Sequence, residues 1–355
     1  MTQGYQGKSI KNQDSLAACI KHFAAYGAAL AGRDYAQASL SLHDFYQQYD
    51  AGYRGAVDAG VRMAMTSFNV FEGIPATIHQ TLLRKILRKR MGFKGVTISD
   101  YDSIIETVVH RVSVDDRDAV RKALLATVDI EMASGAYIKH IPTLVKHGLI
   151  DIDLIDQAVL RVLKLKKDLG LFKNPFKGAN IEKEKSFPLS NPQLAMAKAL
   201  ADESIVLLKN KGNLLPLQNQ KIALLGHLSN SGALLGPWSW HVYRDWEEEK
   251  ESGEARSKTS PVPADKTVEF FKQLKAFGKP IVLIVTAGRP LVLTPIIDDV
   301  EAILYAYFLG SQATYTITDT LLGKNNPSAK LTMTFPRRVG QIPISYNHLN
   351  TGRPF

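Results

Sequence analysis

Short apolar runs alternate with amphipathic stretches through the first half of the chain. Strand-like runs cover Ala18–Ala24, Val61–Asn69, Gly95–Asp100 and Val128–Met132. Between and after them, apolar residues at helical spacing predict helices, at Leu42–Ala56, Thr77–Arg90, Asp115–Thr127, Ile138–His147 and Ile152–Leu169. Strands that alternate with helices predict a parallel α/β sheet with right-handed crossovers.

The second half repeats the alternation after a polar, turn-rich segment from Gly170 to Pro188. We expect a helix at Pro192–Leu208, a buried strand at Lys221–Gly226, a helix at Val268–Phe277, strands at Pro280–Thr286 and Ala302–Phe308, and a helix at Gln312–Leu322. This order predicts a smaller α/β sandwich. The predicted bounds are 1–170 for the first domain, 171–191 for a linker and 192–355 for the second domain.

The first domain has too few strands to close a barrel. Four strand–helix units are half of an eight-stranded barrel, which usually takes about 250 residues. We therefore expect 1–170 to form a partial barrel whose open edges can pair with another chain.

Composition and charge add limits. The chain has 355 residues, of which 45% are hydrophobic and 22% charged, which fits a globular protein with room for two domains. Its net charge of +10 is spread along the sequence. The densest basic run, Arg84–Arg90, keeps Leu83, Ile86 and Leu87 at helical spacing, so we expect one solvated helix face there and no nucleic-acid partner.

Targeting and redox signals are sparse. The single cysteine, Cys19, excludes an internal disulfide framework and a cysteine zinc site. The first residues lack the apolar core of a signal peptide, and no run of eighteen apolar residues occurs. We expect no membrane span and no export signal in the chain as written, and these observations leave the compartment open.

A carboxylate stands where one predicted strand ends. Asp100 follows Val96–Ser99, and parallel α/β enzymes place functional groups at that end of a strand. Asp100 is therefore our first candidate catalytic residue. The structural alternative is that Ser99 or Asp100 caps the following helix.

Other candidate groups are less specific. Lys21 and His22 lie at a strand end, where they could donate hydrogen bonds to sugar hydroxyls or phosphate oxygens, or simply occupy the surface. Arg33 and Asp34 could form a local ion pair of under about 1 kcal/mol. Trp238 and Trp240 could stack on a sugar ring or belong to the core. The sequence contains no phosphate loop, dinucleotide fingerprint, nucleophile elbow or His-Glu-x-x-His motif.

A series of motifs resembles glycoside hydrolase family 3, in its branch of β-glucosidase and β-xylosidase type. They occur in the family's order at Lys21–Gly27, Gly32–Tyr35, Met65–Asn69, Gly73–Thr77, Gly92–Val96, Ile98–Tyr101, Gly236–Trp240, Asn326–Ser328, Thr334–Pro336 and Val339–Ile344. Together they are distributed over nearly the whole chain, although no single motif would be sufficient to indicate the family.

The resemblance implies a fold, a reaction and a set of residues. It implies the C-terminal half of a (β/α)8 barrel, followed by an α/β sandwich, and retaining exo-hydrolysis of terminal β-D-glycosides without metal or organic cofactor. Asp100 matches the nucleophile and Glu254 the acid/base. Residues that match or adjoin the subsite of the terminal sugar, and thus become candidates for substrate binding, are Lys21, His22, Met65, Tyr101 and Trp240.

Departures from the family pattern suggest an alternative. The first half of the barrel is missing, His241 lies only thirteen residues before Glu254, and Ile78-His79 replaces Gly-Asn. The implied partners are a β-linked oligosaccharide or glycoside substrate and either a second copy or a complementing barrel half. The alternative function is therefore an inactive fragment or one half of a split enzyme. The family is often periplasmic or secreted.

Overall fold

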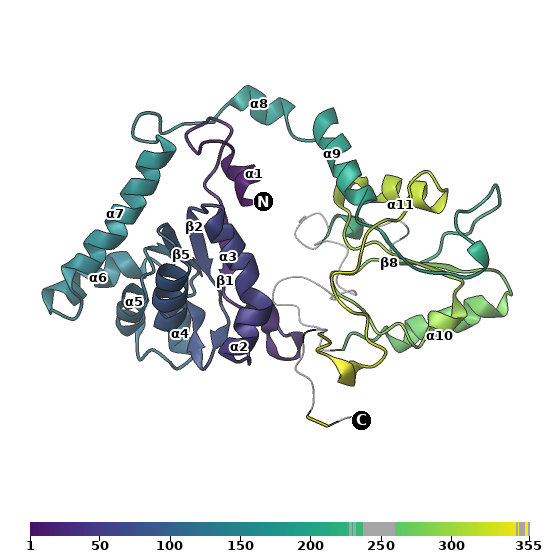
Figure 1. Cartoon of the computed structure of the whole chain (residues 1–355), viewed down its shortest axis with the longest axis horizontal. Coiled ribbons are helices and arrows are strands. Elements are labelled where there is room, and N and C mark those ends of the chain that lie inside the picture. Colours follow the sequence, from purple (N-terminus) through teal and green to yellow (C-terminus); the bar gives the residue numbers. More distant parts are fainter. Residues whose placement is uncertain (227–228, 230–231, 237–259, 346, 348–351, 354–355) are drawn as a thin grey trace. The chain divides into compact units, whose positions relative to one another are not determined.

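The computed structural model describes residues 1–226, 229, 232–236, 260–345, 347 and 352–353. They belong to two compact units, Met1–Asn180 (unit 1) and Ile181–Phe355 (unit 2) (Figure 1). No helix in the described ranges is both long enough and apolar enough to cross a membrane.

Unit 1 is built on a parallel sheet of four strands. The strands are β1 (Cys19–Phe23), β2 (Met63–Thr66), β5 (Val96–Tyr101) and β6 (Ile130–Met132), in the order β1-β2-β5-β6. All three neighbouring pairs are parallel. This confirms the four strands and the parallel sheet predicted from the alternating pattern.

Helices and a small hairpin connect these strands. The α-helices are α1 (Thr2–Gln6), α2 (Leu42–Asp44), α3 (Asp50–Asp58), α4 (Glu106–Val109), α5 (Asp116–Leu125), α6 (Ala136–Lys146) and α7 (Ile152–Leu169). Two π-helices, η3 (Phe45–Tyr49) and η5 (Thr81–Arg90), and three 3-10 turns, η1 (Tyr26–Ala28), η2 (Leu30–Gly32) and η4 (Ala76–Ile78), join them. The hairpin pairs β3 (Val70–Phe71) with β4 (Ile74–Pro75). It was not predicted, because each of its strands has only two residues.

Local sequence fixes where the principal helices begin and end. The carboxylate of Asp151 accepts the N–H of Asp153 at the start of α7, and Gly170 adopts a left-handed conformation just after its end. Asp115 caps α5 in the same manner through the N–H of Asp118. These signals explain why the sequence predicts both helices almost to the residue.

One face of the unit 1 sheet is covered by helices. Ile20, Phe23 and Ala64 pack with buried side chains of η5 and α5 in a single hydrophobic cluster. The opposite face, here called the inner face, carries Cys19, Met63, Met65, Ile98 and Ile130, which pair across the strands and are partly or fully exposed. Parallel sheets are normally buried on both faces, so within unit 1 the described residues leave the inner face without the cover that such a sheet usually has.

A buried carboxylate joins β5 and β6 to two helices. Asp129 Oδ2 accepts hydrogen bonds from Arg88 Nη2 and the Thr97 N–H, both at 2.9 Å. Its Oδ1 accepts Nε and Nη2 of Arg161 in α7, at 2.9 and 2.7 Å. We call this set the Asp129 clamp. Because Asp129 precedes β6 and Thr97 is the second residue of β5, the clamp lies at the amino-terminal end of the sheet.

The basic run in η5 is more deeply involved than the sequence indicates. Leu83, Ile86 and Leu87 are buried as predicted, but Arg88 is not part of a solvated face, because its side chain is only 15% exposed and belongs to the Asp129 clamp. Burial lowers the pKa of Arg88, and the charge of Asp129 opposes that shift. Arg90 stacks on Tyr46, with its guanidinium carbon 3.7 Å from the ring centre.

Gly95 is required by a close approach between β2 and β5. A Cβ at this position would lie 2.2 Å from the carbonyl oxygen of Arg62. We expect Gly95→Ala to cost about 1–3 kcal/mol of unfolding free energy through overpacking. The matched control is Gly55→Ala in α3, where nothing lies within 4 Å and the change should stabilise by about 0.5–1 kcal/mol. Urea unfolding of both variants checks this, and equal stability would contradict it.

Unit 2 contains a mixed sheet of three strands with helices on both faces. The strands β7 (Val206–Asn210), β9 (Ala302–Tyr305) and β8 (Val282–Val285) lie in that order, with β7 antiparallel and β8 parallel to β9. The further elements are α8 (Ile181–Ser186), α9 (Asn191–Asp202), η6 (Lys211–Asn213), η8 (Gly232–Leu235), α10 (Asp265–Ala276), η9 (Ile297–Asp299), η10 (Gly310–Gln312), α11 (Ala313–Leu321) and η11 (Val339–Gln341). Separate apolar clusters place α10 and α11 on opposite faces (Figure 1).

Two predictions for this half are wrong. The helix predicted over Pro192–Leu208 ends at Asp202, and its last residues belong to β7. Lys221–Gly226 is exposed and forms no strand, because no described segment pairs with it. The segment predicted as a linker, 171–191, contains the whole of the short helix α8, and its role as a linker stays a prediction.

Candidate active site

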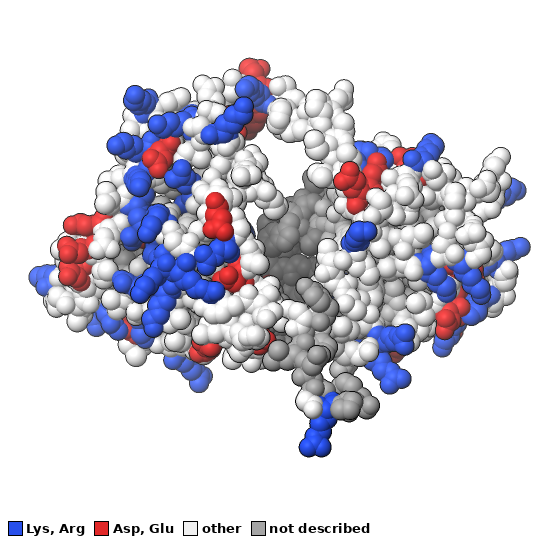
Figure 2. Space-filling model, viewed as in Figure 1, with Lys and Arg blue, Asp and Glu red and all other residues white. Residues whose placement is uncertain are grey.

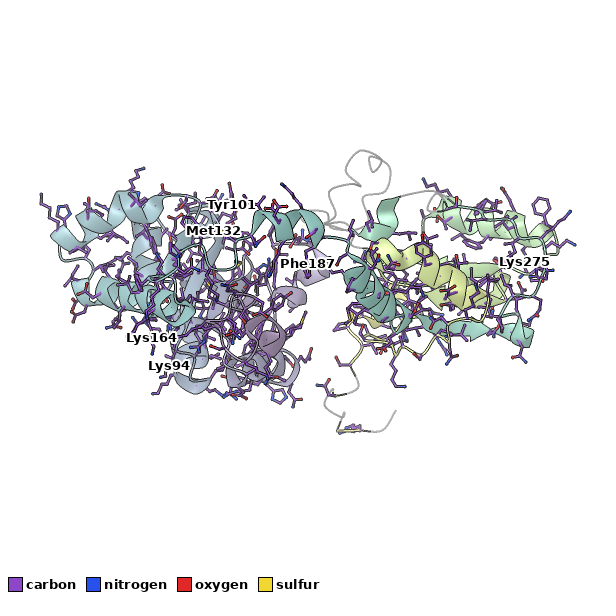
Figure 3. All side chains as sticks on the ribbon, turned by 90° about the horizontal axis from the view of Figure 1, so that it is seen from above. Lys94, Tyr101, Met132, Lys164, Phe187 and Lys275 are labelled. Atoms are coloured by element: carbon purple, nitrogen blue, oxygen red, sulfur yellow. The ribbon has the colours of Figure 1, made fainter. Side chains whose placement is uncertain are left out.

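Several predicted site residues meet at the carboxyl end of the unit 1 sheet. Lys21 and His22 lie near the end of β1, Met65 near the end of β2, and Asp100 and Tyr101 at the end of β5. Figure 3 shows Tyr101 and Met132 together at one end of unit 1 and Lys94, which precedes β5, at the other. The parallel register therefore gathers residues that are far apart in the sequence.

The carboxylate of Asp100 is buried and asymmetrically held. The residue is 8% exposed, and its Oδ1 accepts the N–H of Tyr101 at 2.8 Å. Oδ2 lies 3.2 Å from Nε2 of His22, yet no described group donates a well-aligned hydrogen bond to it. One oxygen is thus held by a backbone N–H, and the other is buried beside His22 without an aligned hydrogen bond from a described group.

The capping alternative for this carboxylate is wrong. Helix α4 starts only at Glu106, after Ile105, and has no side-chain cap. The side chain of Ser99 donates instead to the Asp100 carbonyl at 2.9 Å and accepts the Met132 N–H at 2.8 Å. Neither Ser99 nor Asp100 serves to start a helix.

His22 contacts an aromatic residue that is in turn held by a carboxylate. Its ring meets Tyr26 edge-on, with centroids 5.2 Å apart, and the Tyr26 hydroxyl donates to Asp34 Oδ1 at 2.6 Å. Asp34, for which the sequence suggested only a local ion pair, thereby orients the aromatic residue beside His22.

The remaining predicted sugar contacts of unit 1 are accessible. Lys21 is exposed, Met65 is partly exposed on the inner face, and Tyr101 is 61% exposed. Side chains that bind a polar ligand must be exposed, because a buried side chain could not contact that ligand.

Hydroxyl groups behind Asp100 are functional candidates that the sequence reasoning missed. The side chains of Thr66, Thr77 and Ser103 form a buried chain that ends on the Asp100 carbonyl. Thr66 and Thr77 stand inside recognised motifs, Met65–Asn69 and Gly73–Thr77, but only the folded structure brings their hydroxyls together with that of Ser103.

The chain matches one enzyme family at both ends. The glycosyl hydrolase family 3 N terminal domain matches residues 1–165, and the glycosyl hydrolase family 3 C-terminal domain matches residues 244–355. The chain belongs to glycosyl hydrolase family 3. The resemblance inferred from the sequence motifs is thus confirmed.

The chain is also similar to curated glycosidases. A periplasmic beta-glucosidase of Salmonella typhimurium is 33% identical over 100% of this chain and 56% of its own length. A beta-xylosidase of Formosa agariphila is 26% identical over 97% of this chain and 57% of its own length. The chain thus spans little more than half the length of these relatives.

Solved structures of a beta-glucosidase from Listeria innocua superpose on the chain. The complex with isofagomine has a TM-score of 0.92 and 36% identity, covering 100% of this chain and 57% of that chain. A mutant of the same enzyme in complex with laminaribiose gives a TM-score of 0.90 at 35% identity, covering 100% of this chain and 56% of that one. The shared fold thus extends across all of this chain, and the rest of the enzyme has no counterpart in it.

Two residues implied by the family lie outside the described residues. These are Glu254, the expected acid/base, and Trp240, an expected sugar contact. Their roles stay predictions.

His79 stands where the family pattern has a different residue. It is 4% exposed, its ring lies 5.7 Å from that of Phe71, and burial lowers its pKa. We infer that this departure from the family is accommodated by keeping the imidazole neutral within the core.

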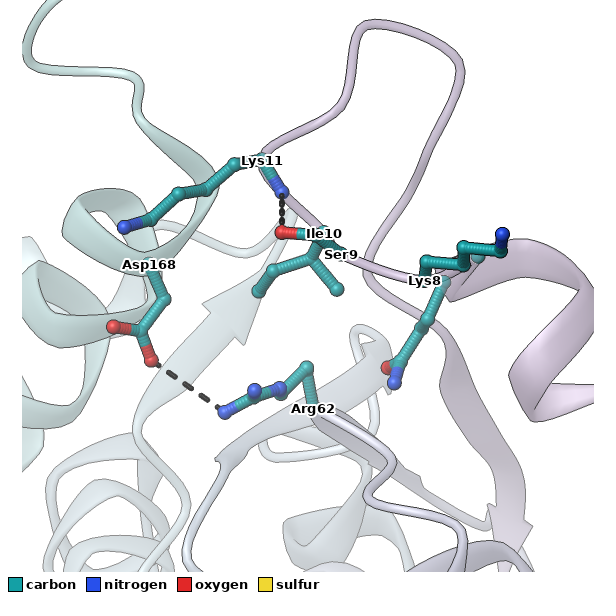
Figure 4. A pocket seen from close by; sticks show the side chains of 8 residues that line it. Lys8, Ser9, Ile10, Lys11, Arg62 and Asp168 are labelled. Atoms are coloured by element: carbon teal, nitrogen blue, oxygen red, sulfur yellow. Dashed lines mark hydrogen bonds and ion pairs between the residues drawn. The ribbon is translucent and has the colours of Figure 1, made fainter.

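A hollow in unit 1 lies at the wrong end of the sheet to be this site. It is lined by Lys8, Lys11, Arg62 and Asp168 among others (Figure 4). Arg62 precedes β2, whereas Asp100 lies near the carboxyl end of the parallel strand β5. Lys and Arg also spread over much of the visible face of unit 1, with acidic residues among them (Figure 2). The charge pattern therefore does not mark the candidate site.

Proposed function

We propose that the chain provides the catalytic carboxylate of a retaining exo-β-glycosidase that releases terminal non-reducing β-D-glucose or β-D-xylose. The observation that carries this proposal is the state of Asp100. Its carboxylate is buried at the carboxyl end of β5, with Oδ1 held by the Tyr101 N–H and Oδ2 beside His22. The relatives named as beta-glucosidase and beta-xylosidase support the substrate class.

The reaction needs two carboxyl groups with opposite tasks. Asp100 attacks the anomeric carbon and forms a covalent glycosyl-enzyme, while Glu254 donates its proton to the departing glycosidic oxygen. Water then attacks the anomeric carbon, Glu254 takes a proton from that water, and the Asp100 carboxylate is released. In a retaining enzyme the two carboxyl groups stand about 5–5.5 Å apart.

The environment of Asp100 suits the nucleophilic task. The Tyr101 N–H donates to one carboxylate oxygen, and the His22 imidazole stands beside the other. Because Oδ2 accepts no aligned hydrogen bond from a described group, we assign the attack to this oxygen. Lys21, His22, Met65, Tyr101 and Trp240 are proposed to contact the sugar.

The proposed architecture follows from the same argument. Residues 1–170 are proposed as the second half of a (β/α)8 barrel, 171–191 as a linker, and 192–355 as a shortened α/β sandwich that contributes Glu254. The four parallel strands of unit 1 support the first assignment, since a closed barrel of this class has eight.

Product stereochemistry tests the proposed reaction. The purified chain is incubated with p-nitrophenyl β-D-glucopyranoside and the matching xyloside, and proton NMR follows the first sugar anomer released. We expect the β anomer, and we expect a 2-deoxy-2-fluoro-β-glucosyl fluoride to label the peptide that contains Asp100. Release of the α anomer first, or a label elsewhere, would contradict the assignment.

The open sheet favours a second candidate function, one half of a split enzyme. Among the described residues, β1 and β6 each pair with a strand on one side only, and the inner face is partly exposed. A polypeptide carrying four further parallel strand–helix units could pair with both edges and cover Met65 and Ile98. The relatives' additional length is consistent with such a partner.

Complementation distinguishes the two candidates. The chain is assayed alone and with the first barrel half of the Salmonella relative, expressed as a separate polypeptide. For the split enzyme we expect a stoichiometric complex by size-exclusion chromatography and hydrolysis only in the mixture. Full activity of the chain alone, unchanged by the added half, would exclude the split-enzyme function.

A further inference from the structure

Three buried hydroxyls form a directed chain behind Asp100. Thr77 Oγ1 donates to Ser103 Oγ at 2.9 Å, and Ser103 Oγ donates to the Asp100 carbonyl oxygen at 3.2 Å. Thr66 Oγ1 lies 2.9 Å from Thr77 Oγ1. A hydroxyl has one proton, and that of Thr77 is used on Ser103, so Thr66 must be the donor to Thr77.

This chain connects separate parts of unit 1. Thr66 ends β2, Thr77 lies in η4, and Ser103 follows β5. All three residues are at most 4% exposed, so water does not compete for their hydrogen bonds. In such surroundings consecutive hydrogen bonds polarise one another and strengthen the series.

The Asp100 carbonyl is where these contacts converge. It accepts the Ser99 hydroxyl at 2.9 Å, the Ser103 hydroxyl at 3.2 Å and the Ser103 N–H at 3.2 Å. Two residues further, Asp102 adopts a left-handed backbone with φ of 55° and donates its N–H to the Met132 carbonyl at 3.1 Å. The backbone that carries the candidate nucleophile is therefore fixed on both sides.

We propose that Thr66, Thr77 and Ser103 are positioning residues that hold the Asp100 backbone so that its carboxylate faces His22 and the sugar site. Thr77 is the central member of the chain. It accepts a hydrogen bond from Thr66 at the end of β2 and donates one to Ser103 in the loop after β5. The effect of these residues on hydrolysis rests on the proposed function. Their effect on the orientation of Asp100 does not, because it is a property of the folded chain.

The test uses an isosteric substitution and a matched control. Thr77→Val removes the hydroxyl but keeps the shape of the side chain. Thr107→Val removes another fully buried hydroxyl of unit 1, one that bonds Ile104 and Ser113 and makes no hydrogen bond to Asp100. Thr77→Ser restores the hydroxyl and is the rescue variant.

The first measurement needs no turnover. In nitrogen-15 NMR spectra, the Tyr101 amide, which donates to Asp100 Oδ1, and the His22 ring report on the carboxylate. Asp100→Asn defines the size of the shift when that carboxylate is lost. We expect Thr77→Val to move both signals and to speed amide exchange at Tyr101, Thr107→Val to leave them in place, and Thr77→Ser to restore them.

Kinetics give the second measurement, on the chain alone or on the complemented complex. We expect Thr77→Val to lower kcat roughly tenfold with little change in KM, because small displacements of a reacting group are costly. Should Thr77→Val fail to fold, Ser103→Ala removes one donor to the same carbonyl and should shift the Tyr101 amide in the same direction.

Unchanged Tyr101 and His22 signals in a folded Thr77→Val or Ser103→Ala variant would overturn the proposal, and so would equal shifts in Thr77→Val and Thr107→Val. If Asp100 proves dispensable for hydrolysis, the proposed function fails while the NMR result still decides the positioning. The two failures are therefore distinguishable.

Discussion

Replacing Asp100 by asparagine should lower the rate of β-glucoside hydrolysis by about 10⁴-fold or more. The amide has the shape of the carboxylate, but it cannot supply the negative oxygen that attacks the anomeric carbon. A loss of this size corresponds to about 5.5 kcal/mol of transition-state stabilisation. The measurement is kcat/KM for p-nitrophenyl β-D-glucopyranoside, on whichever form of the protein is active.

Asp102→Asn is the matched control for this prediction. It removes a carboxylate from the same loop, and Asn tolerates the left-handed backbone at that position, so activity should change little. In Asp100→Ala, added azide should occupy the vacated space and convert an activated β-glucoside to the α-glycosyl azide. An Asp100→Asn variant that keeps wild-type activity, with deamidation excluded by mass spectrometry, would refute the assignment.

Asp129→Asn should destabilise unit 1 by about 3–5 kcal/mol. The substitution leaves Arg88 and Arg161, which are 15% and 21% exposed, without the charge that compensates their burial, and losing one partner of a buried ion pair has this cost. Burial already lowers the pKa of Arg88, and without Asp129 that effect is less opposed. A domain of this size should lose roughly 10 °C in Tm.

The control for the Asp129 clamp is an exposed ion pair. Glu182 and Lys185 are 85% and 69% exposed, so Glu182→Gln should change stability by less than about 1 kcal/mol. Differential scanning calorimetry of both variants decides the matter. A Tm for Asp129→Asn equal to that of Glu182→Gln would show that the clamp contributes no stability.

The sequence predicts most of unit 1 because local and long-range signals agree there. Each strand is a short apolar run, and capping residues such as Asp151 and Gly170 mark the ends of the helices. Unit 2 is less predictable. The run Ile205–Leu208 fits the end of a helix as well as a strand, and only its pairing with β9 decides for the strand.

The candidate site shows the same limit. The meeting of His22 with Asp100 follows from parallel strands that end together, and it is predictable once β1, β2 and β5 are recognised. The Asp129 clamp and the Thr77 hydroxyl chain depend on side-chain directions across several elements. The one available signal for the clamp was a charged residue, Asp129, near the start of the predicted strand Val128–Met132.

The inner face of the sheet also carries a built-in chemical reporter. Cys19 is the only cysteine in the sequence. It lies on the edge strand β1 and pairs with Met63 of β2. Although the residue is exposed, desolvation of the thiol by neighbouring protein atoms raises its pKa to about 11, so the thiol should react slowly at neutral pH. Any polypeptide that covers the inner face should slow alkylation of this thiol further. The rate of Cys19 alkylation therefore measures when the inner face becomes covered, without mutation or dye.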